Sequence, residues 1–275
     1  MPELPEVEAV RRVLGPQIHG LMIDKVMVNR PEVVAHPGSD AFCKRLVGQT
    51  IDRMERRGKY LLMRLNSSDR VVIHLRMTGC LLYTPADLPQ EKHTHITFQL
   101  HNGKEMRFSD TRRFGRLWLI ASGEADPYSG IEKLGKEPFD PDLCAEYLRA
   151  RLGNRKKAIK ECLLEQGLIA GIGNIYSDEI LFAAKIYPAR PAKALTEQEW
   201  TRLAVAIPQQ LSYFIEKNEM TPEEYVQSKG QAYRNAPFLK VYGRAGEACP
   251  VCGEPLFRTV IGGRSSTYCP ACQKE

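Results

Sequence analysis

The stretch CPVCGEPLFRTVIGGRSSTYCPAC (249–272) decides how the end of the chain folds. Its two C-x-x-C pairs, Cys249 with Cys252 and Cys269 with Cys272, are separated by sixteen residues. This spacing is typical of a four-cysteine zinc ribbon, in which each pair gives two thiolates to one ion. Because all four ligand positions are filled, the sequence predicts one structural Zn²⁺ and no catalytic metal. Four free cysteines or two disulfides are the disfavoured alternative.

The residues between the two pairs predict a β-hairpin whose turn is Gly262-Gly263. Arg258 and Arg264 lie on this hairpin, and basic residues on a rigid hairpin can bind phosphates. From this segment alone, a solvated turn is the simpler interpretation.

Helical patterns precede this tail, at 141–152, 155–166, 176–185 and 196–217. Within LLEQGLIAGIGNIYSDEILF (163–182), two helical segments are joined by GIGN (171–174). Glycines let a backbone approach a ligand closely, and free amides begin the next helix, so the segment is a candidate anion site. Many tight helix–helix turns look the same.

The first half of the chain predicts a helix over 5–18, then short strands from about 21 to 120. The clearest strands cover 60–65, 71–77, 95–100 and 116–120, and the Gly-, Pro- and acid-rich stretch 122–141 is typical of a linker. We therefore predict an α+β protein. The expected parts are a β-sandwich with an N-terminal helix (1–135), a linker and the start of a helical domain (136–152), that helical domain (153–237) and the zinc hairpin (238–275).

The composition restricts the class of protein. A chain of 275 residues suits two domains, and a net charge of +6 favours a polyanionic partner only weakly. The acidic, polar start MPELPEVEAV is not typical of a signal peptide, and no stretch reaches the length of a membrane span. We expect a soluble, cytoplasmic protein. Four further cysteines are scattered and have no assigned role: Cys43, Cys80, Cys144 and Cys162.

Two stretches of the first domain, 53–64 and 107–116, place Lys and Arg next to aromatic residues. Cations neutralise phosphates and apolar tips can insert between bases, so these stretches are candidates for nucleic-acid binding. A solvated, charged strand edge explains them equally well. His74 lies in an apolar strand, where a histidine is usually a structural residue.

Taken in order, the motifs MPELPEVE, RRGKYL, HLRMTG, SDTRRFG, GIGNIYSDE, VYGR and GGRSSTYCPACQ run from Pro2 to Gln273. Together they resemble the formamidopyrimidine-DNA glycosylase family. The resemblance implies a helix–two-turns–helix motif in the helical domain and a cleft that DNA crosses. It also implies a monomeric base-excision repair enzyme that binds damaged double-stranded DNA and is associated with the nucleoid.

The resemblance also implies roles for single residues. Pro2 would be the nucleophile, Glu3 the acid that assists opening of the sugar ring, and Glu6 a supporting residue. Lys59 would contact the phosphate near the lesion. Further DNA contacts would come from His74, Asn174, Tyr242, Arg258 and Arg264, while Met77, Arg112 and Phe114 would fill the space left by the extruded nucleotide.

The chemistry explains why proline must stand second. An internal proline nitrogen is an inert amide, but removal of Met1 would give Pro2 a free secondary amine. An α-amino group has a pKa of about 7.7–8.0, so a useful fraction is neutral near pH 7. The amine can attack C1′ of a flipped-out nucleotide and displace the base. The resulting iminium acidifies the C2′ proton, and two eliminations then break the 3′ and 5′ phosphate bonds.

The segment 219–237 departs from the family pattern. The resemblance implies a loop that closes over 8-oxoguanine through backbone amides and a small hydroxyl residue. Pro222 has no N–H, Met220 has no hydroxyl, and Glu223 adds negative charge. We therefore expect formamidopyrimidines or other oxidised bases to be better substrates than 8-oxoguanine.

Three alternatives remain. An endonuclease VIII-like enzyme for oxidised pyrimidines is disfavoured by Leu4 and by the GIGNIYSDE loop, while the altered 219–237 segment leaves room for it. A non-catalytic DNA-binding relative is disfavoured by Pro2, Glu3, Glu6 and Lys59 together. A zinc ribbon used for protein contacts would explain the tail alone.

Overall fold

A computed structural model describes residues 2–230 and 233–274, so Met1 and residues 231–232 of the unusual loop lie outside the described residues. The chain forms two compact units, each built from separate stretches. Unit 1 comprises residues 1–2, 6–132 and 219–233, and unit 2 comprises residues 3–5, 133–218 and 234–275.

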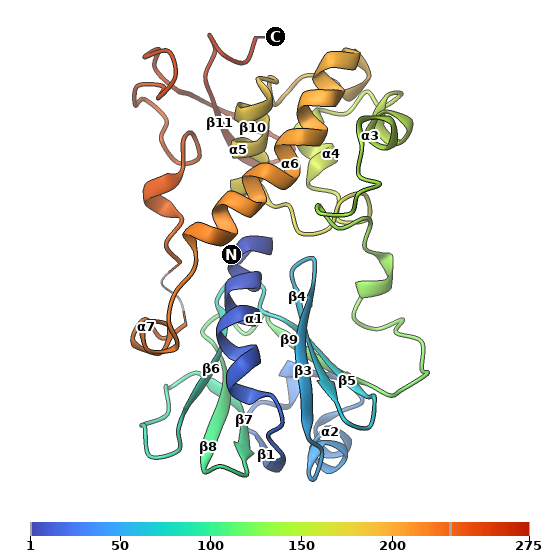
Figure 1. The fold of residues 1–275 in the computed structure, drawn as a ribbon, viewed down its shortest axis with the longest axis vertical. Coiled ribbons are helices and arrows are strands. Elements are labelled where there is room, and N and C mark those ends of the chain that lie inside the picture. The colour runs from blue at the N-terminus through green and yellow to red at the C-terminus, as the bar shows by residue number, and fades with distance from the viewer. Residues whose placement is uncertain (1, 231–232, 275) are drawn as a thin grey trace. The chain divides into compact units, whose positions relative to one another are not determined.

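Unit 1 is a β-sandwich (Figure 1). One sheet has the order β2 (Val34–His36), β9 (Arg116–Ile120), β5 (Arg70–His74), β4 (Tyr60–Leu65) and β3 (Ile51–Arg57). The other has the order β1 (Ile23–Val28), β7 (Thr94–Leu100), β8 (Lys104–Asp110) and β6 (Gly79–Pro85). The helical elements of this part of the chain are α1 (Leu4–Ile18), η1 (Pro31–Val33), α2 (Ser39–Leu46), η2 (Ile131–Lys133) and α7 (Pro222–Gln227).

Buried apolar side chains from both sheets and from α1 form one core in unit 1, with Val10, Ile73, Leu81 and Phe108 fully or almost fully buried. Only β2 and β9 pair in parallel, and the other strand pairs described are antiparallel. Short turns join the consecutive antiparallel pairs β3–β4, β4–β5 and β7–β8, as the alternation of strands and turn residues predicts.

Unit 2 is helical and ends in the hairpin. Its elements are α3 (Ala145–Leu152), α4 (Ile159–Leu163), α5 (Asn174–Ala184), η3 (Ala192–Ala194), α6 (Glu197–Lys217), η4 (Ala236–Phe238), β10 (Phe257–Ile261) and β11 (Arg264–Tyr268). Thr196 and Glu199 form a capping box that starts α6. A second apolar core lies between α3, α4, α5 and α6, and includes Leu163, Tyr176 and Trp200.

Several predicted element boundaries were wrong. The strand predicted over 71–77 ends at His74, because Gly79 N–H bonds to Leu75 C=O and Arg76 has a φ of 57°. The helix predicted over 141–152 starts only at Ala145, because Asp140 accepts hydrogen bonds from the amides of the following turn. The helix predicted over 155–166 is only five residues long (α4).

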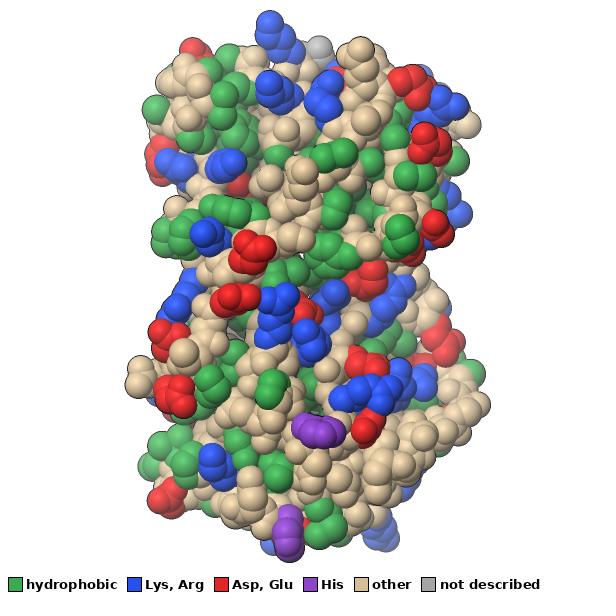
Figure 2. All heavy atoms as spheres, viewed as in Figure 1, with side chains coloured by type: hydrophobic (Ala, Val, Ile, Leu, Met, Phe, Trp, Pro, Cys, Tyr) green, Lys and Arg blue, Asp and Glu red, His purple; other side chains and the backbone are tan. Residues whose placement is uncertain are grey.

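Charge is mixed over the visible face of each unit: Figure 2 shows Lys and Arg side chains lying beside Asp and Glu side chains. In unit 1, Glu8 pairs with Arg11 and Arg12, and Glu55 pairs with Arg53 and Arg64. The net positive charge therefore does not identify the functional surface. Among the described residues, no helix is both long and apolar enough to cross a bilayer.

Candidate catalytic and nucleic-acid-binding site

Glu3 is held in unit 2 by the first turn of α5. Its side chain is buried, with 2% of the residue exposed, and its carboxylate accepts N–H bonds from Gly173 (2.8 Å), Ile175 (2.9 Å) and Tyr176 (3.3 Å). The first amides of a helix have no partner within the helix, and its N-terminus favours negative charge. The anion that occupies this helix terminus is thus a side chain of the protein itself.

Two glycines make this approach possible. A Cβ atom at Gly173 would lie 2.3 Å from the carboxyl carbon of Glu3, and one at Gly171 would lie 2.5 Å from a methyl of Leu4. Gly171 also has a φ of +94° and accepts the N–H of Leu4 at 3.1 Å. The GIGN loop is therefore shaped to receive residues 3 and 4, which explains its glycines sterically.

Behind this loop lies a buried ion pair. Lys160 is fully buried and donates to Asp178 at 2.7 Å and to the carbonyl of Ser265 at 2.9 Å. Asp178 also accepts the hydroxyl of Ser266 and the N–H of Thr267. Burial lowers the pKa of Lys160 and raises the pKa of Asp178, while the attraction between the two opposes both shifts. The pair fastens β11 to α5.

Asn174 starts α5, and its amide group donates to the carbonyl of Ser265 at 3.1 Å. Its side-chain oxygen is buried and has no hydrogen-bond partner among the described residues. Arg264 begins β11, one residue before Ser265, and is exposed. A donor group of a ligand would satisfy the Asn174 oxygen, since a buried acceptor without a partner is costly.

The two arginines of the hairpin lie on opposite faces. Arg258 pairs across the hairpin with Thr267, and Arg264 pairs with Ile261. Cross-strand partners share a face and successive residues alternate, so Arg258 and Arg264 point in opposite directions. They cannot bind the same phosphate from one face of the hairpin.

The four cysteines of the tail converge in unit 2. Their sulfur atoms all lie within 4.8 Å of one another. Cys249 and Cys272 are 4.0 Å apart, and Cys252 and Cys269 are 3.4 Å apart. Four thiolates around one zinc ion, with Zn–S bonds of about 2.3 Å, would lie roughly 3.8 Å apart. The donor set therefore fits a tetrahedral Zn²⁺, which leaves no coordination position for a substrate.

In unit 1, Pro2 and Glu6 are both buried at the start of α1. Burial raises the pKa of Tyr233, and the negative charge of Glu6 raises it further. Glu6 is therefore close to this tyrosine in the interior of the unit. Its position is that of a supporting group rather than a surface acid.

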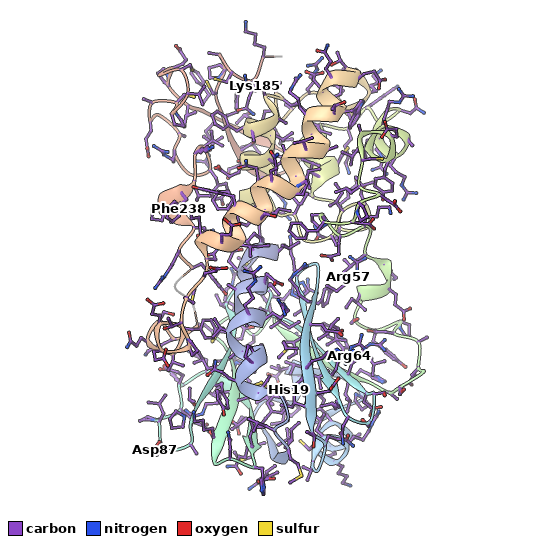
Figure 3. The ribbon with its side chains drawn as sticks, viewed as in Figure 1. His19, Arg57, Arg64, Asp87, Lys185 and Phe238 are labelled. Carbon is purple, nitrogen blue, oxygen red and sulfur yellow. The ribbon has the colours of Figure 1, made fainter. Side chains whose placement is uncertain are left out.

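Lys59 occupies the tight turn between β3 and β4, directly after Arg57 (labelled in Figure 3) and Gly58, whose φ is 53°. Lys59 is largely buried. Arg56 supports the turn, because its guanidinium donates to the carbonyl of Gly58 and to Glu8 of α1, each at 3.1 Å. The turn that carries Lys59 is therefore tied to the helix that follows Pro2.

Glu8 acts in this support as an anion. Burial raises its pKa, but hydrogen bonds and positive charge from Arg11, Arg56 and Arg12 outweigh burial, so the net pKa is below the ordinary value. The ion pairs therefore persist at neutral pH.

His74 ends β5 and is neutral at physiological pH. Burial lowers its pKa to about 3, and the positive charges of Arg76 and Lys59 act in the same direction. The N–H of Arg76 donates to Nδ1 at 3.0 Å, so Nδ1 is an acceptor and the proton of the neutral ring lies on Nε2. Lys59 and His74 thus present two donors close together, a cationic one and a neutral one.

Met77, Arg112 and Phe114 form an exposed cluster on unit 1. Met77 is 42% exposed and Phe114 48% exposed, far more than core residues. The guanidinium of Arg112 donates to the sulfur of Met77 at 2.9 Å and lies 4.8 Å from the centre of the Phe114 ring. The explanation of Met77 and Phe114 as ordinary core residues is excluded.

A buried aspartate holds the two loops that carry this cluster. Asp110 accepts the hydroxyl of Thr78, the N–H of Arg112 at 3.2 Å and the N–H of Gly115 at 2.7 Å. A Cβ atom at Gly115 would lie 2.6 Å from the ring of Phe108, so only glycine fits. The exposed apolar side chains are therefore presented on a rigid base.

Comparison with known proteins agrees with this geometry. The N-terminal domain model of formamidopyrimidine-DNA glycosylase matches residues 1–117, the H2TH domain model of the same enzyme matches residues 134–224, and a zinc finger found in FPG and IleRS matches residues 246–274. The formamidopyrimidine-DNA glycosylase of Desulforamulus reducens is 46% identical over 275 residues, covering 100% of this chain and 99% of the relative. The chain belongs to the formamidopyrimidine-DNA glycosylase family. The enzyme of Pelotomaculum thermopropionicum is 44% identical over 274 residues, with 100% and 99% coverage.

Solved structures give the same result for the fold. Lactococcus lactis Fpg in complex with DNA containing an abasic site has a TM-score of 0.90 and 35% identity, and covers 99% of this chain and 100% of that chain. The same protein in complex with FAPY-dG-containing DNA has a TM-score of 0.90 and 36% identity, with the same coverage. The predicted family, the fold with its β-sandwich, H2TH motif and zinc hairpin, and the structural zinc ion are confirmed.

Two residues important to this formamidopyrimidine-DNA glycosylase site were missed by the sequence analysis. Glu179 is buried and accepts the N–H groups of Lys240, Val241 and Tyr242 at 2.9–3.1 Å, which fixes the backbone of the predicted DNA contact Tyr242. Asp178 fixes the hairpin that carries Arg264. Two adjacent acids inside an otherwise apolar helix were the available signal, because buried carboxylates need partners.

The scattered cysteines of this family member form no cluster with one another in the described residues. Cys80 and Cys162 are buried, and burial raises the pKa of Cys80 to about 11. A thiol with so high a pKa stays protonated and unreactive at neutral pH.

Proposed function

We propose that this DNA glycosylase of the formamidopyrimidine family acts on formamidopyrimidine lesions with Pro2 as its nucleophile, and that it then cleaves the abasic strand. The observation that carries the proposal is the buried Glu3, which directly follows Pro2 and is fixed by three amides of α5. A residue held in this way keeps its neighbour at a defined place, as covalent catalysis requires.

In the proposed reaction, the Pro2 nitrogen uses its lone pair to bond to C1′, and the C1′–base bond breaks with its electron pair leaving on the base. Opening of the sugar ring converts the adduct into an iminium between Pro2 and C1′. Loss of the C2′ proton expels the 3′ phosphate, and loss of a further proton expels the 5′ phosphate. Hydrolysis of the iminium then returns the amine. No step requires the zinc ion.

Glu3 has a second part in this scheme. The three amide donors hold its carboxyl group in place, and in the neutral form that group can protonate the sugar ring oxygen. As an anion it stabilises the positive charge of the iminium beside it. Both actions depend on a carboxyl group one residue from Pro2.

Lys59 and His74 would bind phosphate together in unit 1. The ammonium of Lys59 supplies charge, and the neutral imidazole supplies an N–H from Nε2. In unit 2, Asn174, Tyr242, Arg258 and Arg264 would contribute further contacts, with Asn174 and Arg264 close to the carbonyl of Ser265.

Borohydride trapping tests the mechanism. The protein is incubated with duplexes that carry a formamidopyrimidine, an 8-oxoguanine opposite cytosine, or an abasic site, and borohydride is added. We expect a covalent protein–DNA adduct that peptide mapping places on Pro2. Lys59→Arg serves as the control, because Lys59 is the nearby amine that could also form an imine. Absence of an adduct with all three duplexes, or an adduct on Lys59, would contradict the proposal.

Within the unusual 219–237 segment, Thr221 caps the short helix α7. The hydroxyl of Thr221 accepts the N–H of Glu224 at 3.2 Å, and the Glu224 carboxylate accepts the N–H of Thr221 at 2.8 Å. Pro222 occupies the first helical position, where its missing N–H costs nothing. The Thr221 hydroxyl and the N–H groups of Thr221, Glu224 and Tyr225 are therefore engaged within α7. Groups that are already hydrogen-bonded within α7 cannot also bond to 8-oxoguanine, which is a physical reason to expect poor binding of that base.

We predict that the enzyme excises a formamidopyrimidine opposite cytosine at least tenfold faster than 8-oxoguanine opposite cytosine. Single-turnover rates on both duplexes measure this. Thr221→Ala opens the capping box and should narrow the ratio, whereas Thr201→Ala, which alters a helical threonine in unit 2, should not. Equal rates for the two lesions would refute the assignment of specificity to this segment.

Oxidised pyrimidines are the second candidate substrate class. Lactococcus lactis Fpg has been crystallised with DNA containing an oxidised pyrimidine, so a relative with this fold accepts such DNA. A duplex with an oxidised pyrimidine in the same panel decides between the two classes. Excision faster than that of the formamidopyrimidine would favour the endonuclease VIII-like alternative.

The exposed cluster of unit 1 gives another prediction. Arg112→Ala should lower single-turnover excision roughly 10- to 100-fold, because it removes the cation that lies between Met77 and Phe114 and a hydrogen bond of a charged group. Cleavage of an abasic duplex should fall less, since no damaged base is extruded there. Arg113→Ala is the matched control, because it removes an equal charge from the next position. Equal losses in both variants would mean that the charge alone matters.

We also propose that the protein acts as a monomer on duplex DNA inside the cell. Each chain carries one set of the proposed site residues, so a second copy is not needed. Sedimentation velocity of the free protein and of its complex with an abasic duplex tests this, with one protein per duplex as the expected result.

A further inference from the structure

One face of the sheet β1-β7-β8-β6 in unit 1 is polar and yet buried. Thr84 of β6, Glu105 of β8 and Arg107 of β8 lie on the same face, because Thr84 pairs with Glu105, and Leu82 with Arg107. All three polar residues are buried, and Thr84 is only 1% exposed. A polar sheet face normally meets solvent, so its covering requires an explanation.

Arg107 holds the loop that follows β6 over this polar face of the sheet. Its guanidinium donates to Glu105 at 2.7 Å, to the carbonyl of Leu88 at 2.8 Å and to the carbonyl of Ala86 at 3.2 Å. Asp87, labelled in Figure 3, lies in this loop, on the side of the sheet where α7 also lies. One buried side chain therefore ties the loop that follows β6 across the sheet. The guanidinium of Arg107 is engaged by Glu105 and by the loop carbonyls, so it is not available to a ligand.

A cavity of about 450 Å³ lies between the sheet, the loop that follows β6, and α7. Leu82, Leu88, Pro89 and Val226 supply apolar walls. The other charged groups at the cavity pair with each other, since Lys229 lies 2.8 Å from Glu91. A volume of this size with mostly apolar walls and few polar groups is typical of small-molecule sites.

Among the buried side-chain atoms of the described residues, one polar atom of the lining lacks a hydrogen-bond partner. The hydroxyl oxygen of Thr84 is buried and makes no hydrogen bond there, although Thr84 lines the cavity. By contrast, the neighbouring hydroxyls of Thr94 and Ser109 bond to each other at 3.0 Å. Burying a hydroxyl without a partner is costly, so the Thr84 hydroxyl marks where an occupant would bond.

We propose that this cavity binds a small neutral molecule with an apolar ring system of about the size of indole and one hydrogen-bonding group, which pairs with the Thr84 hydroxyl. A neutral molecule is favoured, because Glu105 engages the buried Arg107 and Lys229 pairs with Glu91. The occupant would touch both the sheet and α7. It would therefore hold the segment 219–230 on the sheet and stabilise unit 1.

Binding of indole and of 1-methylindole to the full-length, zinc-loaded protein tests the proposal. Both have the same apolar body, but only indole has an N–H that can donate to Thr84. Saturation-transfer NMR titrations should give a dissociation constant for indole that is about tenfold lower than that for 1-methylindole, as expected for one hydrogen bond in a buried site.

Three variants make the result specific. Thr84→Val keeps the shape and removes the hydroxyl, so it should weaken indole about tenfold and leave 1-methylindole unchanged within twofold. Leu88→Trp fills the cavity and should abolish binding of both. Asp87→Ala, in the same loop, should change neither, and thermal melting of each variant verifies that it is folded.

The proposal is overturned if neither compound binds at millimolar concentration, which would mean that water occupies the cavity. It is also overturned if Leu88→Trp binds indole as the unmodified protein does, or if Thr84→Val does. Excision activity is not used as a readout, so failure here is independent of the proposed role of Pro2.

Discussion

A protein with one glycine added in front of Pro2 is expected to lose base excision and strand cleavage together, by roughly ten-thousand-fold or more, as enzymes do when their nucleophile is removed. The extension turns the Pro2 nitrogen into an amide, which has no basic lone pair and cannot form an iminium. Single-turnover assays on formamidopyrimidine and abasic duplexes, each with and without borohydride, measure both losses. Mass spectrometry must first establish that the unmodified protein begins at Pro2.

Two controls isolate the amine from the fold. Pro2→Gly keeps a free N-terminal amine and should still form the borohydride adduct, although more slowly. The extended protein should bind a duplex with a tetrahydrofuran abasic analogue as tightly as the unmodified protein, within a few-fold. An extended protein that still cleaves abasic DNA would exclude the Pro2 nitrogen, and peptide mapping of its borohydride adduct would then distinguish Lys59 from the amine of the added glycine.

The second large effect is expected from loss of zinc. Removing the ion, or replacing Cys269 by serine, should lower the affinity for abasic-analogue DNA at least about 100-fold. This corresponds to losing two charge-assisted phosphate contacts at roughly 1.5 kcal/mol each. The apolar cluster beneath the hairpin is small, with Phe182, Val241 and Leu256 beside the cysteines, so the hairpin cannot fold on packing alone.

Unfolding of the hairpin has a cost inside unit 2 as well. When β11 unfolds, Lys160 loses its hydrogen bond to Ser265 and Asp178 loses its hydrogen bond from Thr267, while both charged side chains remain buried. Fluorescence anisotropy gives the affinity, and a colorimetric chelator gives the zinc released per chain. Cys144→Ser, which changes a cysteine outside the cluster, is the matched control. Unchanged DNA affinity in a zinc-free protein would contradict the assignment of the hairpin as a DNA-binding element.

Local signals in the sequence carried most of the correct predictions. Two cysteine pairs predict a metal site because each pair is a complete half-site, whatever the rest of the chain does. The predicted strands 60–65 and 116–120 coincide with β4 and β9. Glycine positions in GIGN pointed to close backbone approach, and the structure shows that Glu3 makes this approach.

Non-local partners could not be predicted in this way. Asp178 bonds to Thr267, 89 positions away, and Glu179 bonds to Val241, 62 positions away. A single sequence does not show which backbone N–H groups will bond to a given buried carboxylate. For the same reason, the sequence did not predict the ion pair of Arg56 with Glu8. It also did not predict the bond by which Arg107 holds a loop over the polar face of the sheet.

One available local signal was misread. The segment 219–237 was interpreted from Met220, Pro222 and Glu223 as a departure from the family's loop. Read for themselves, Thr221, Pro222 and Glu224 are a threonine cap, a proline in the first helical position and the glutamate of a capping box, which together start α7. The departure from the family pattern was interpreted as the loss of a base-binding loop, although these residues encode a short helix.

The bond between Glu3 and the start of α5 has a consequence for biosynthesis. Glu3 is among the first residues to leave the ribosome, and its partner Gly173 follows 170 positions later. At about 5–20 residues per second, Glu3 waits roughly 10–30 s for its partner. A nascent or prematurely terminated chain that stops before α5 therefore lacks the clamp on residue 3, even if the β-sandwich has already folded. On the proposed mechanism such fragments should not cleave DNA, because Glu3 lacks its partners until α5 has been synthesised.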